Sequence, residues 1–137
     1  MKYVLDTNVL SALLKGNTEA SARLKATARC DVAVPQPVIS EIAYGIERLR
    51  KSRRKNDLHA RFELFKTEIK RIAWTDEVSA CFGAIKANLE RRGEIIEDFD
   101  IAIASHAMAV GAILVTADRS HMMRIEGLDV EDWTTFR

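Results

Sequence analysis

A run of four apolar residues, Ala112 to Val115, is the feature that most constrains the fold. A continuous apolar run of this length is typical of a strand that is buried on both faces, as strands in parallel sheets are. Elsewhere, short apolar segments alternate with segments whose apolar residues recur at helical spacing. Because strands and helices alternate along the chain, the sequence predicts an α/β protein with a mostly parallel central sheet.

The expected elements divide the chain with no linker or repeat between them. Strands are expected at 3–5, 32–34, 72–74 and 112–115, with a last short strand that includes Val130. Helices are expected at 9–14, 18–28, 40–49, 56–70, 76–92 and 99–110, with Ser40 and Asp98 as N-caps. A chain of 137 residues, 47% hydrophobic and 30% charged, fits one globular domain, residues 1–137, with a core of its own.

Charge and cysteine content exclude several classes of protein. Lys and Arg number 21 against 20 Asp and Glu, so the net charge gives no sign of a nucleic-acid partner. Cys30 and Cys81 lack metal-ligand spacing and are expected to be buried free thiols of a reducing compartment. Asp6 ends the first apolar segment well short of a signal sequence, and the longest uncharged apolar stretch, 108–115, is too short to cross a bilayer. We therefore expect a cytoplasmic protein with no membrane partner.

Four acidic residues are predicted to share one edge of the sheet. Asp6 follows the first strand, Asp118 follows the run 112–115, and Glu41 and Asp100 fall in the first turns of two expected helices. In a parallel sheet the carboxyl ends of the strands and the starts of the following helices lie on the same side. Each acid alone could be a helix cap or a turn former. Four unrelated caps would have no reason to lie at the same edge of the sheet, so their shared location favours a common site.

A cluster of carboxylates needs a counter-charge. Two carboxylates ~4 Å apart repel by about 4 kcal/mol at an effective dielectric of ~20, so protons or a cation must offset the repulsion. Oxygen ligands without His or Cys select Mg²⁺ or Mn²⁺. An ion held in this way can orient a phosphate and activate water, so the pattern indicates metal-assisted hydrolysis of a phosphodiester.

Five segments resemble PIN-domain nucleases, and VapC-type toxins in particular. In family order they are Val4–Asn8, Ile39–Gly45, Asp98–Ala107, Leu114–Asp118 and Gly127–Trp133, and together they extend over nearly the whole chain. The resemblance implies a three-layer α/β/α sandwich and a Mg²⁺- or Mn²⁺-dependent endoribonuclease, the toxin of a type II toxin–antitoxin pair. It also implies a homodimer and a cognate antitoxin that silences it. Several family members cut tRNA or ribosomal RNA, so RNA is the expected substrate, with tRNA as one candidate.

The resemblance also implies a role for each acid by motif position. The catalytic positions are filled by Asp6, Glu41, Asp100 and Asp118. Asp6 and Asp100 are the expected metal ligands. Glu41 would orient the attacking water, and Asp118 would complete the acidic pocket directly or through water.

The chain also matches the family at two supporting positions and departs from the family pattern in one segment. Asn8 and Thr116 match supporting polar positions, and Thr116 would hydrogen-bond a carboxylate or a bridging water. The departure is the segment 121–123, His-Met-Met, where the family commonly has an acidic residue and Phe. This segment is expected to form a peripheral turn that affects none of the four acids.

Six basic residues follow Glu41 within eight positions that contain no acid: Arg48, Arg50, Lys51, Arg53, Arg54 and Lys55. They could form a ridge that guides RNA phosphates toward the acidic pocket. They could equally be a solvated helix end whose charges complement the helix dipole, or they could dock an acidic segment of the antitoxin. The sequence leaves these three interpretations open.

Three other functions compete with the nuclease. A haloacid-dehalogenase-like phosphatase would need Asp where Asn8 stands. A phosphoryl-receiver domain would need paired acids after the first strand and a Lys after a late strand, which Asp6-Thr7 and Asp118-Arg119 do not supply. A non-catalytic RNA- or protein-binding PIN-like module would tolerate replacement of the acids, and the presence of all four weighs against it.

Overall fold

Five short strands form one parallel sheet in the computed structural model, which describes residues 1–135. The strands are β1 (Tyr3–Leu5), β2 (Val32–Pro35), β3 (Lys70–Ile72), β4 (Ile113–Val115) and β5 (Val130–Glu131). Their order in the sheet is β3-β2-β1-β4-β5, and every neighbouring pair is parallel. Residues 136 and 137, the last two of the predicted domain, lie outside the described residues.

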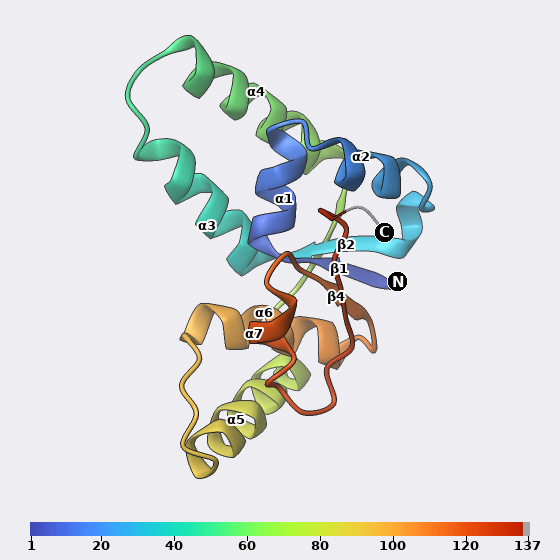
Figure 1. Cartoon of the computed structure of the whole chain (residues 1–137), viewed down its shortest axis with the longest axis vertical. Coiled ribbons are helices and arrows are strands. Elements are labelled where there is room, and N and C mark those ends of the chain that lie inside the picture. Colours follow the sequence, from blue (N-terminus) through green and yellow to red (C-terminus); the bar gives the residue numbers. More distant parts are fainter. Residues whose placement is uncertain (136–137) are drawn as a thin grey trace.

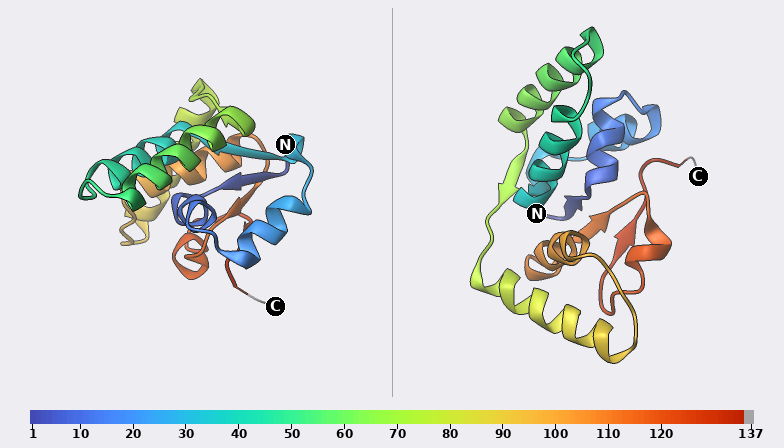
Figure 2. Two further views of the ribbon diagram at one scale, coloured as in Figure 1. Left: turned by 90° about the horizontal axis from the view of Figure 1, so that it is seen from above. Right: turned by 90° about the vertical axis from the view of Figure 1, so that its left-hand side faces the viewer.

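Helices cover both faces of the sheet, which confirms the predicted three-layer α/β/α sandwich. One layer contains α1 (Thr7–Leu14), α2 (Thr18–Lys25), α3 (Gln36–Glu47) and α4 (Arg53–Glu68). The other contains α5 (Asp76–Arg91), α6 (Asp98–Ala109) and α7 (Arg119–Met122). In Figure 1 the first layer lies above the sheet and the second below it, and the right-hand view in Figure 2 agrees with this division. A short 3₁₀ helix, η1 (Arg29–Asp31), leads into β2.

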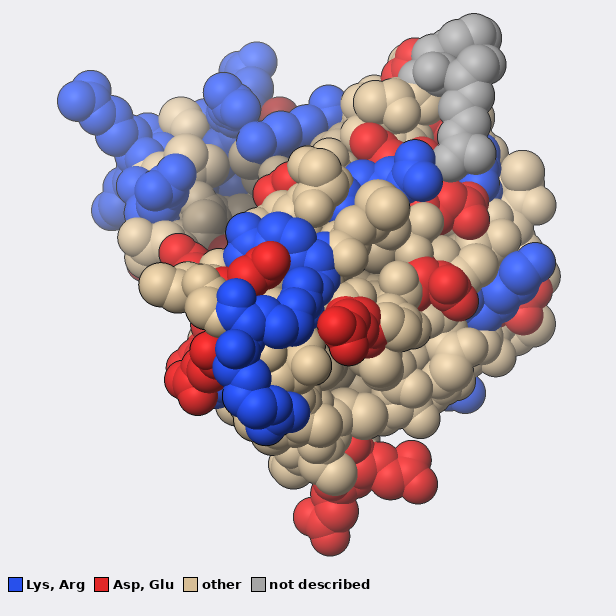
Figure 3. Space-filling model, turned by 60° about the horizontal axis from the view of Figure 1, so that its bottom comes forward, with Lys and Arg blue, Asp and Glu red and all other residues tan. Residues whose placement is uncertain are grey.

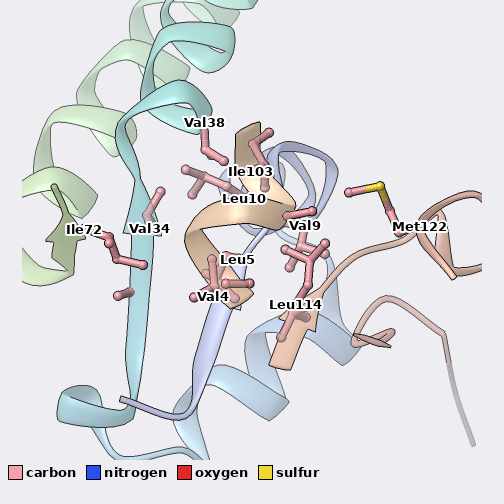
Figure 4. Close-up of a cluster of buried hydrophobic side chains, with 14 of the residues drawn as sticks. Val4, Leu5, Val9, Leu10, Val34, Val38, Ile72, Ile103, Leu114 and Met122 are labelled. Atoms are coloured by element: carbon pink, nitrogen blue, oxygen red, sulfur yellow. The ribbon is translucent and has the colours of Figure 1, made fainter. Parts of the chain in front are cut away.

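The core is centred on β1, the middle strand. Val4 and Leu5 of β1 are fully buried between side chains of α1 on one face and α6 on the other, among them Leu10 and Ile103 (Figure 4). Every residue of α6 from 101 to 107 is buried. Burial on nearly all sides explains why this helix reads as a continuous apolar segment in the sequence.

Several expected boundaries are wrong by a few residues, including those of α1, α2 and α4, and three others have a clear physical reason. β3 covers Lys70–Ile72 rather than 72–74, because it is an edge strand whose first two side chains are exposed and give no apolar signal. α3 begins at Gln36, not after Ser40, because a proline is tolerated in the first turn of a helix. α6 begins at Asp98 itself, with Glu97 at the N-cap position.

Two smaller expectations also fail. Asp98 does not act as an N-cap, and its carboxylate instead accepts a hydrogen bond from Lys86 at 2.9 Å. The cysteines are free as expected but they are not buried, since Cys30 is exposed and Cys81 is half-buried. No helix within residues 1–135 has both the length and the apolar character that crossing a membrane requires.

Candidate active site

Asp6 lies at the point where the order of the strands changes direction. β1 has β2 on one side and β4 on the other, and the chain leaves the carboxyl end of each of these strands at the same edge of the sheet. In α/β sheets the crevice outside two such strands is where ligands bind. Asp6 directly follows β1 there, and its Oδ1 accepts a hydrogen bond of 2.7 Å from the backbone N–H of Thr7 as the N-cap of α1. It is a carboxylate with only 4% of its surface exposed.

Thr116 holds the second oxygen of this carboxylate. Its Oγ1 donates to Asp6 Oδ2 at 2.9 Å, and it accepts from the backbone N–H of Asp118 at 3.1 Å and from Asn8 Nδ2 at 3.4 Å. Asn8 Oδ1 in turn accepts from the backbone N–H of Ala117 at 2.9 Å. The hydroxyl therefore uses its one proton and both lone pairs. Both expected supporting residues belong to the network that fixes Asp6.

Two further carboxylates act on Asp6 electrostatically. The pKa of Asp6 is raised from 3.8 to about 6, chiefly by burial. The hydrogen bonds from Thr116 and Thr7 act in the opposite direction, and the negative charges of Asp100 and Glu41 add to the rise. Three of the four predicted acids therefore interact electrostatically, and the buried carboxylate of Asp6 is at the centre of this negatively charged group.

Glu41 is positioned by α1. It lies in the second turn of α3, not in the first turn as expected, because α3 begins at Gln36. Thr7 Oγ1 donates to Glu41 Oε1 at 2.5 Å. Since the Thr7 backbone N–H also binds Asp6, one residue links the two carboxylates. Sequence reasoning missed this role, although Thr7 stands directly after Asp6 in a polar triplet at the strand end.

His121 is the second residue that sequence reasoning missed. Its Nε2 lies 3.3 Å from Asp100 Oδ2, and both side chains are about two-thirds buried. Asp100 is in the first turn of α6, as expected. The expected peripheral turn is instead the helix α7, which lies against the site. Nothing in the sequence pairs two residues that are 21 positions apart on different helices.

Asp118 contacts the site only through its backbone N–H. It is exposed at the N-cap position of α7, where its side chain makes no capping hydrogen bond. Its N–H binds Thr116, and its charge is not among the causes of the Asp6 pKa shift. Across residues 1–135, no three Asp, Glu, His or Cys side chains stand close enough, as arranged, to hold one ion. The structure therefore groups Asp6, Glu41 and Asp100, with Asp118 at the edge.

A hollow of about 230 Å³ connects Glu41 to part of the basic segment. Its lining includes Glu41 and Thr7 at one end and Lys15, Arg48 and Arg54 at the other. A neighbouring hollow is lined by Lys15, Arg54 and further basic side chains of α4. Figure 3 shows Lys and Arg side chains gathered at the upper left, over the α3–α4 hairpin.

The six basic residues do not share one role. Lys55 is structural, because its Nζ donates to the carbonyl oxygens of Glu47 and Leu49 at the end of α3. Arg53 and Arg54 lie in the first turn of α4, where the helix dipole disfavours positive charge. A favourable interaction with the dipole of α4 therefore does not explain the positions of Arg53 and Arg54. The other three are Arg48, which ends α3, and the exposed loop residues Arg50 and Lys51.

The fold agrees with comparisons with known proteins. A model of the PIN domain matches residues 3–127, and the chain belongs to this family. It is 31% identical over 135 residues to "Ribonuclease VapC2" of Rickettsia felis, covering 97% of this chain and 98% of that protein. It is 30% identical over 135 residues to "tRNA(fMet)-specific endonuclease VapC" of Shigella flexneri, covering 98% and 99%. Within the PIN family the chain is of the VapC type.

Solved structures with a fold similar to that of this chain also contain VapC proteins. VapBC2 from Rickettsia felis, bound to a fragment of promoter DNA, contains a chain with a TM-score of 0.87 and 29% identity, covering 97% of this chain and 99% of that one. DNA-bound VapBC from Salmonella typhimurium has a TM-score of 0.87 and 26% identity, with coverage of 97% and 98%. Each of these similar structures is a complex of a VapC chain with VapB.

Proposed function

We propose that this protein is a metal-dependent endoribonuclease that acts in the cytoplasm as the toxin of a type II toxin–antitoxin pair. The observation that carries the proposal is the buried Asp6 carboxylate, fixed by two hydrogen bonds and lying in the field of Asp100 and Glu41. The names of the VapC relatives support RNA as the substrate, with tRNA as the first candidate.

Mg²⁺ or Mn²⁺ is the proposed cofactor, and the residues present fit it. The donors are carboxylate oxygens, which hard divalent ions prefer. Burial raises the pKa of Asp6 by more than its two hydrogen bonds lower it, and the charges of Asp100 and Glu41 add to the rise. A cation at this carboxylate would offset these effects. Asp6 and Asp100 would hold the ion. When bound, such an ion supplies a Lewis acid for a phosphate oxygen and lowers the pKa of water.

The other polar residues would position the reactants. Glu41 has one oxygen held by Thr7 and another available, so it can orient a water molecule and accept its proton. Thr116 and Asn8 keep Asp6 in one orientation. Asp118 would contribute to the edge of the pocket, with water between it and the other acids.

The basic residues beside the acidic pocket would bind the RNA backbone. Arg48 and Arg54 line the same hollow as Glu41, so a phosphate bound there lies close to the proposed reaction centre. Arg50, Lys51 and Arg53 would extend this contact along the α3–α4 hairpin. Binding of this kind is electrostatic and independent of base identity.

A cognate antitoxin is the proposed protein partner, because the similar solved structures are VapBC complexes. An antitoxin that occupied the acidic pocket would exclude RNA from it. The homodimer expected from the family resemblance stays a prediction.

Cleavage of purified RNA tests the proposal. Wild-type protein should cut tRNA or total RNA with Mg²⁺ or Mn²⁺ and lose activity in a chelator, whereas Asp100→Asn and Glu41→Gln should be inactive while keeping their circular dichroism spectra. Asp129→Asn, which removes an exposed carboxylate away from the site, is the matched control and should stay active. Full activity of Asp100→Asn would refute the assignment, and RNA binding without any cleavage would favour the non-catalytic module.

A further inference from the structure

An imidazole ring lies beside the acidic site. Within residues 1–135, His121 is the only side chain at hydrogen-bond distance from the Asp100 carboxylate, with Nε2 3.3 Å from Oδ2. The two side chains are 28% and 30% exposed, so they are shielded from most of the solvent but still open to an ion or a water molecule. Asp100 also acts electrostatically on Asp6. The imidazole therefore stands next to the carboxylates that the proposed function assigns to a divalent ion.

The position of His121 is fixed by its neighbours in the chain. Met122, the next residue, is 1% exposed and belongs to the cluster of buried side chains in Figure 4. Just after α7, Arg124 Nε donates to Glu94 Oε2 at 2.9 Å, and the Arg124 carbonyl oxygen accepts from Arg92 at 2.9 Å. These bonds tie the end of α7 to the loop that precedes α6. The ring is thus presented to the site with little conformational freedom left to lose on binding.

A second pair of histidine and carboxylate, on α4, shows what is particular to the first. His59 Nε2 lies 3.6 Å from Glu63 Oε1, but these side chains are 63% and 51% exposed. Lys66 Nζ lies 2.9 Å from the same oxygen, so a cation of the protein already compensates this carboxylate. The Asp100 carboxylate has no Lys or Arg partner in the described part of the chain. The half-buried pair at the site therefore lacks the cation that the surface pair has.

A nitrogen donor changes which ions a site prefers. Carboxylate and water oxygens suit both Mg²⁺ and Mn²⁺, whereas neutral imidazole is a ligand of first-row transition ions. Between positions 1 and 135, no three donor side chains are close enough, as arranged, to hold one ion. Water would therefore fill several positions around the ion, as it commonly does around small divalent ions.

We propose that His121 is a ligand of the divalent ion that binds beside Asp100, and that its nitrogen makes the site prefer Mn²⁺ to Mg²⁺. The inference rests on the metal site of the proposed function and adds a nitrogen to the carboxylate oxygens assigned there. In this role the unprotonated Nε2 faces the ion and the ring proton lies on Nδ1. One ion then compensates the carboxylate and binds the ring that faces it.

A structural role for the same pair makes different predictions. If His121 only donated a hydrogen bond to Asp100 and held it in place, its loss would weaken Mg²⁺ and Mn²⁺ binding to the same extent. No nitrogen would then be bonded to the ion. A measurement of nitrogen coordination and of the preference between the two ions separates these roles.

Electron paramagnetic resonance of the whole chain with Mn²⁺ alone tests the inference without RNA. Pulsed spectra should show a nitrogen coupled to bound Mn²⁺, and incorporation of ¹⁵N-histidine should convert the coupling to that of ¹⁵N. His121→Gln should abolish this coupling and raise the Mn²⁺ dissociation constant roughly tenfold or more. His59→Gln, which removes the exposed histidine of the α4 pair, is the matched control and should behave like the wild type. The third histidine, His106, is fully buried.

Competition with Mg²⁺ measures the preference. His121→Asp replaces the nitrogen by oxygen and should lower the ratio of the Mg²⁺ to the Mn²⁺ dissociation constant on the order of tenfold, with an unchanged circular dichroism spectrum. The inference is overturned if the wild type shows no coupling to histidine nitrogen, or if the ratio is the same in the wild type and His121→Asp. The proposed function survives either result as long as Asp100→Asn weakens Mn²⁺ binding. If Asp100→Asn binds Mn²⁺ like the wild type, the metal site fails and the inference fails with it.

Discussion

Replacement of Asp6 by Asn should stabilise the protein at neutral pH while it abolishes RNA cleavage. The pKa of Asp6 rises from 3.8 to about 6 on folding, which corresponds to about 3 kcal/mol at about 1.4 kcal/mol per pKa unit. A raised carboxyl pKa means that the folded state disfavours the charged form. The penalty is therefore absent below pH 3.8, grows between pH 3.8 and about 6, and is complete above that range.

Urea unfolding in a chelator at two pH values measures this effect. At pH 7.5, Asp6→Asn should be more stable than the wild type by about 1–3 kcal/mol, a midpoint shift on the order of 1 M urea. Near pH 4 the difference should nearly vanish, because Asp6 of the wild type is then protonated in the folded state. Asp129→Asn, at an exposed position, should show no such dependence on pH.

Addition of Mn²⁺ should reverse the order of stability. An ion that binds only the folded wild type stabilises it by mass action, whereas the variant has lost one of the two proposed ligands. A difference in stability that does not change between the two pH values would contradict the reasoning, because the raised pKa of Asp6 requires the difference to grow with pH.

Thr116→Val should lower kcat/KM for RNA by roughly 10–100-fold, since it removes the hydroxyl that orients Asp6, and Thr116→Ser should restore most of the activity in the same assay. Joint replacement of Arg48 and Arg54 by Gln should weaken RNA binding and reduce the slope of log affinity against log salt by roughly 1–2. Fluorescence anisotropy measures this slope, and Arg29→Gln at an exposed position is the control. An unchanged slope would mean that Arg48 and Arg54 do not contact the RNA. Trp133→Ala should cost about 3–5 kcal/mol of unfolding free energy in urea, because Trp133 is fully buried against the ring of Tyr3, and a loss below about 1 kcal/mol would contradict this.

The central strands of the sheet were predicted well because they are short and apolar. β1 and β4 are buried on both faces, so their sequences carry a clear signal, and the positions of Asp6 and Thr116 followed from them. The edge strand β3 was misplaced because two of its three side chains face solvent. The start of α3 was missed because a proline in the first turn resembles a break.

The candidate site was only partly predictable. All four acids were expected together because strand ends and helix starts share one side of a parallel sheet. The structure groups Asp6, Glu41 and Asp100 and leaves Asp118 at the edge. Thr7 and His121 were missed because their roles depend on which side chains meet across the fold. The roles of the basic residues depend on where α4 begins, which the charges alone do not reveal.

The hydrogen bond between Thr116 and Asp6 joins residues that are 110 positions apart. As a ribosome extends the polypeptide, β1 emerges first, yet its neighbour β4 is made only after all the helices from α1 to α6. A nascent chain thus carries Asp6 without the hydroxyl that orients it. A protein that could damage the RNA of its own cell therefore cannot orient its buried carboxylate until β4 and Thr116 have been made, long after Asp6 itself.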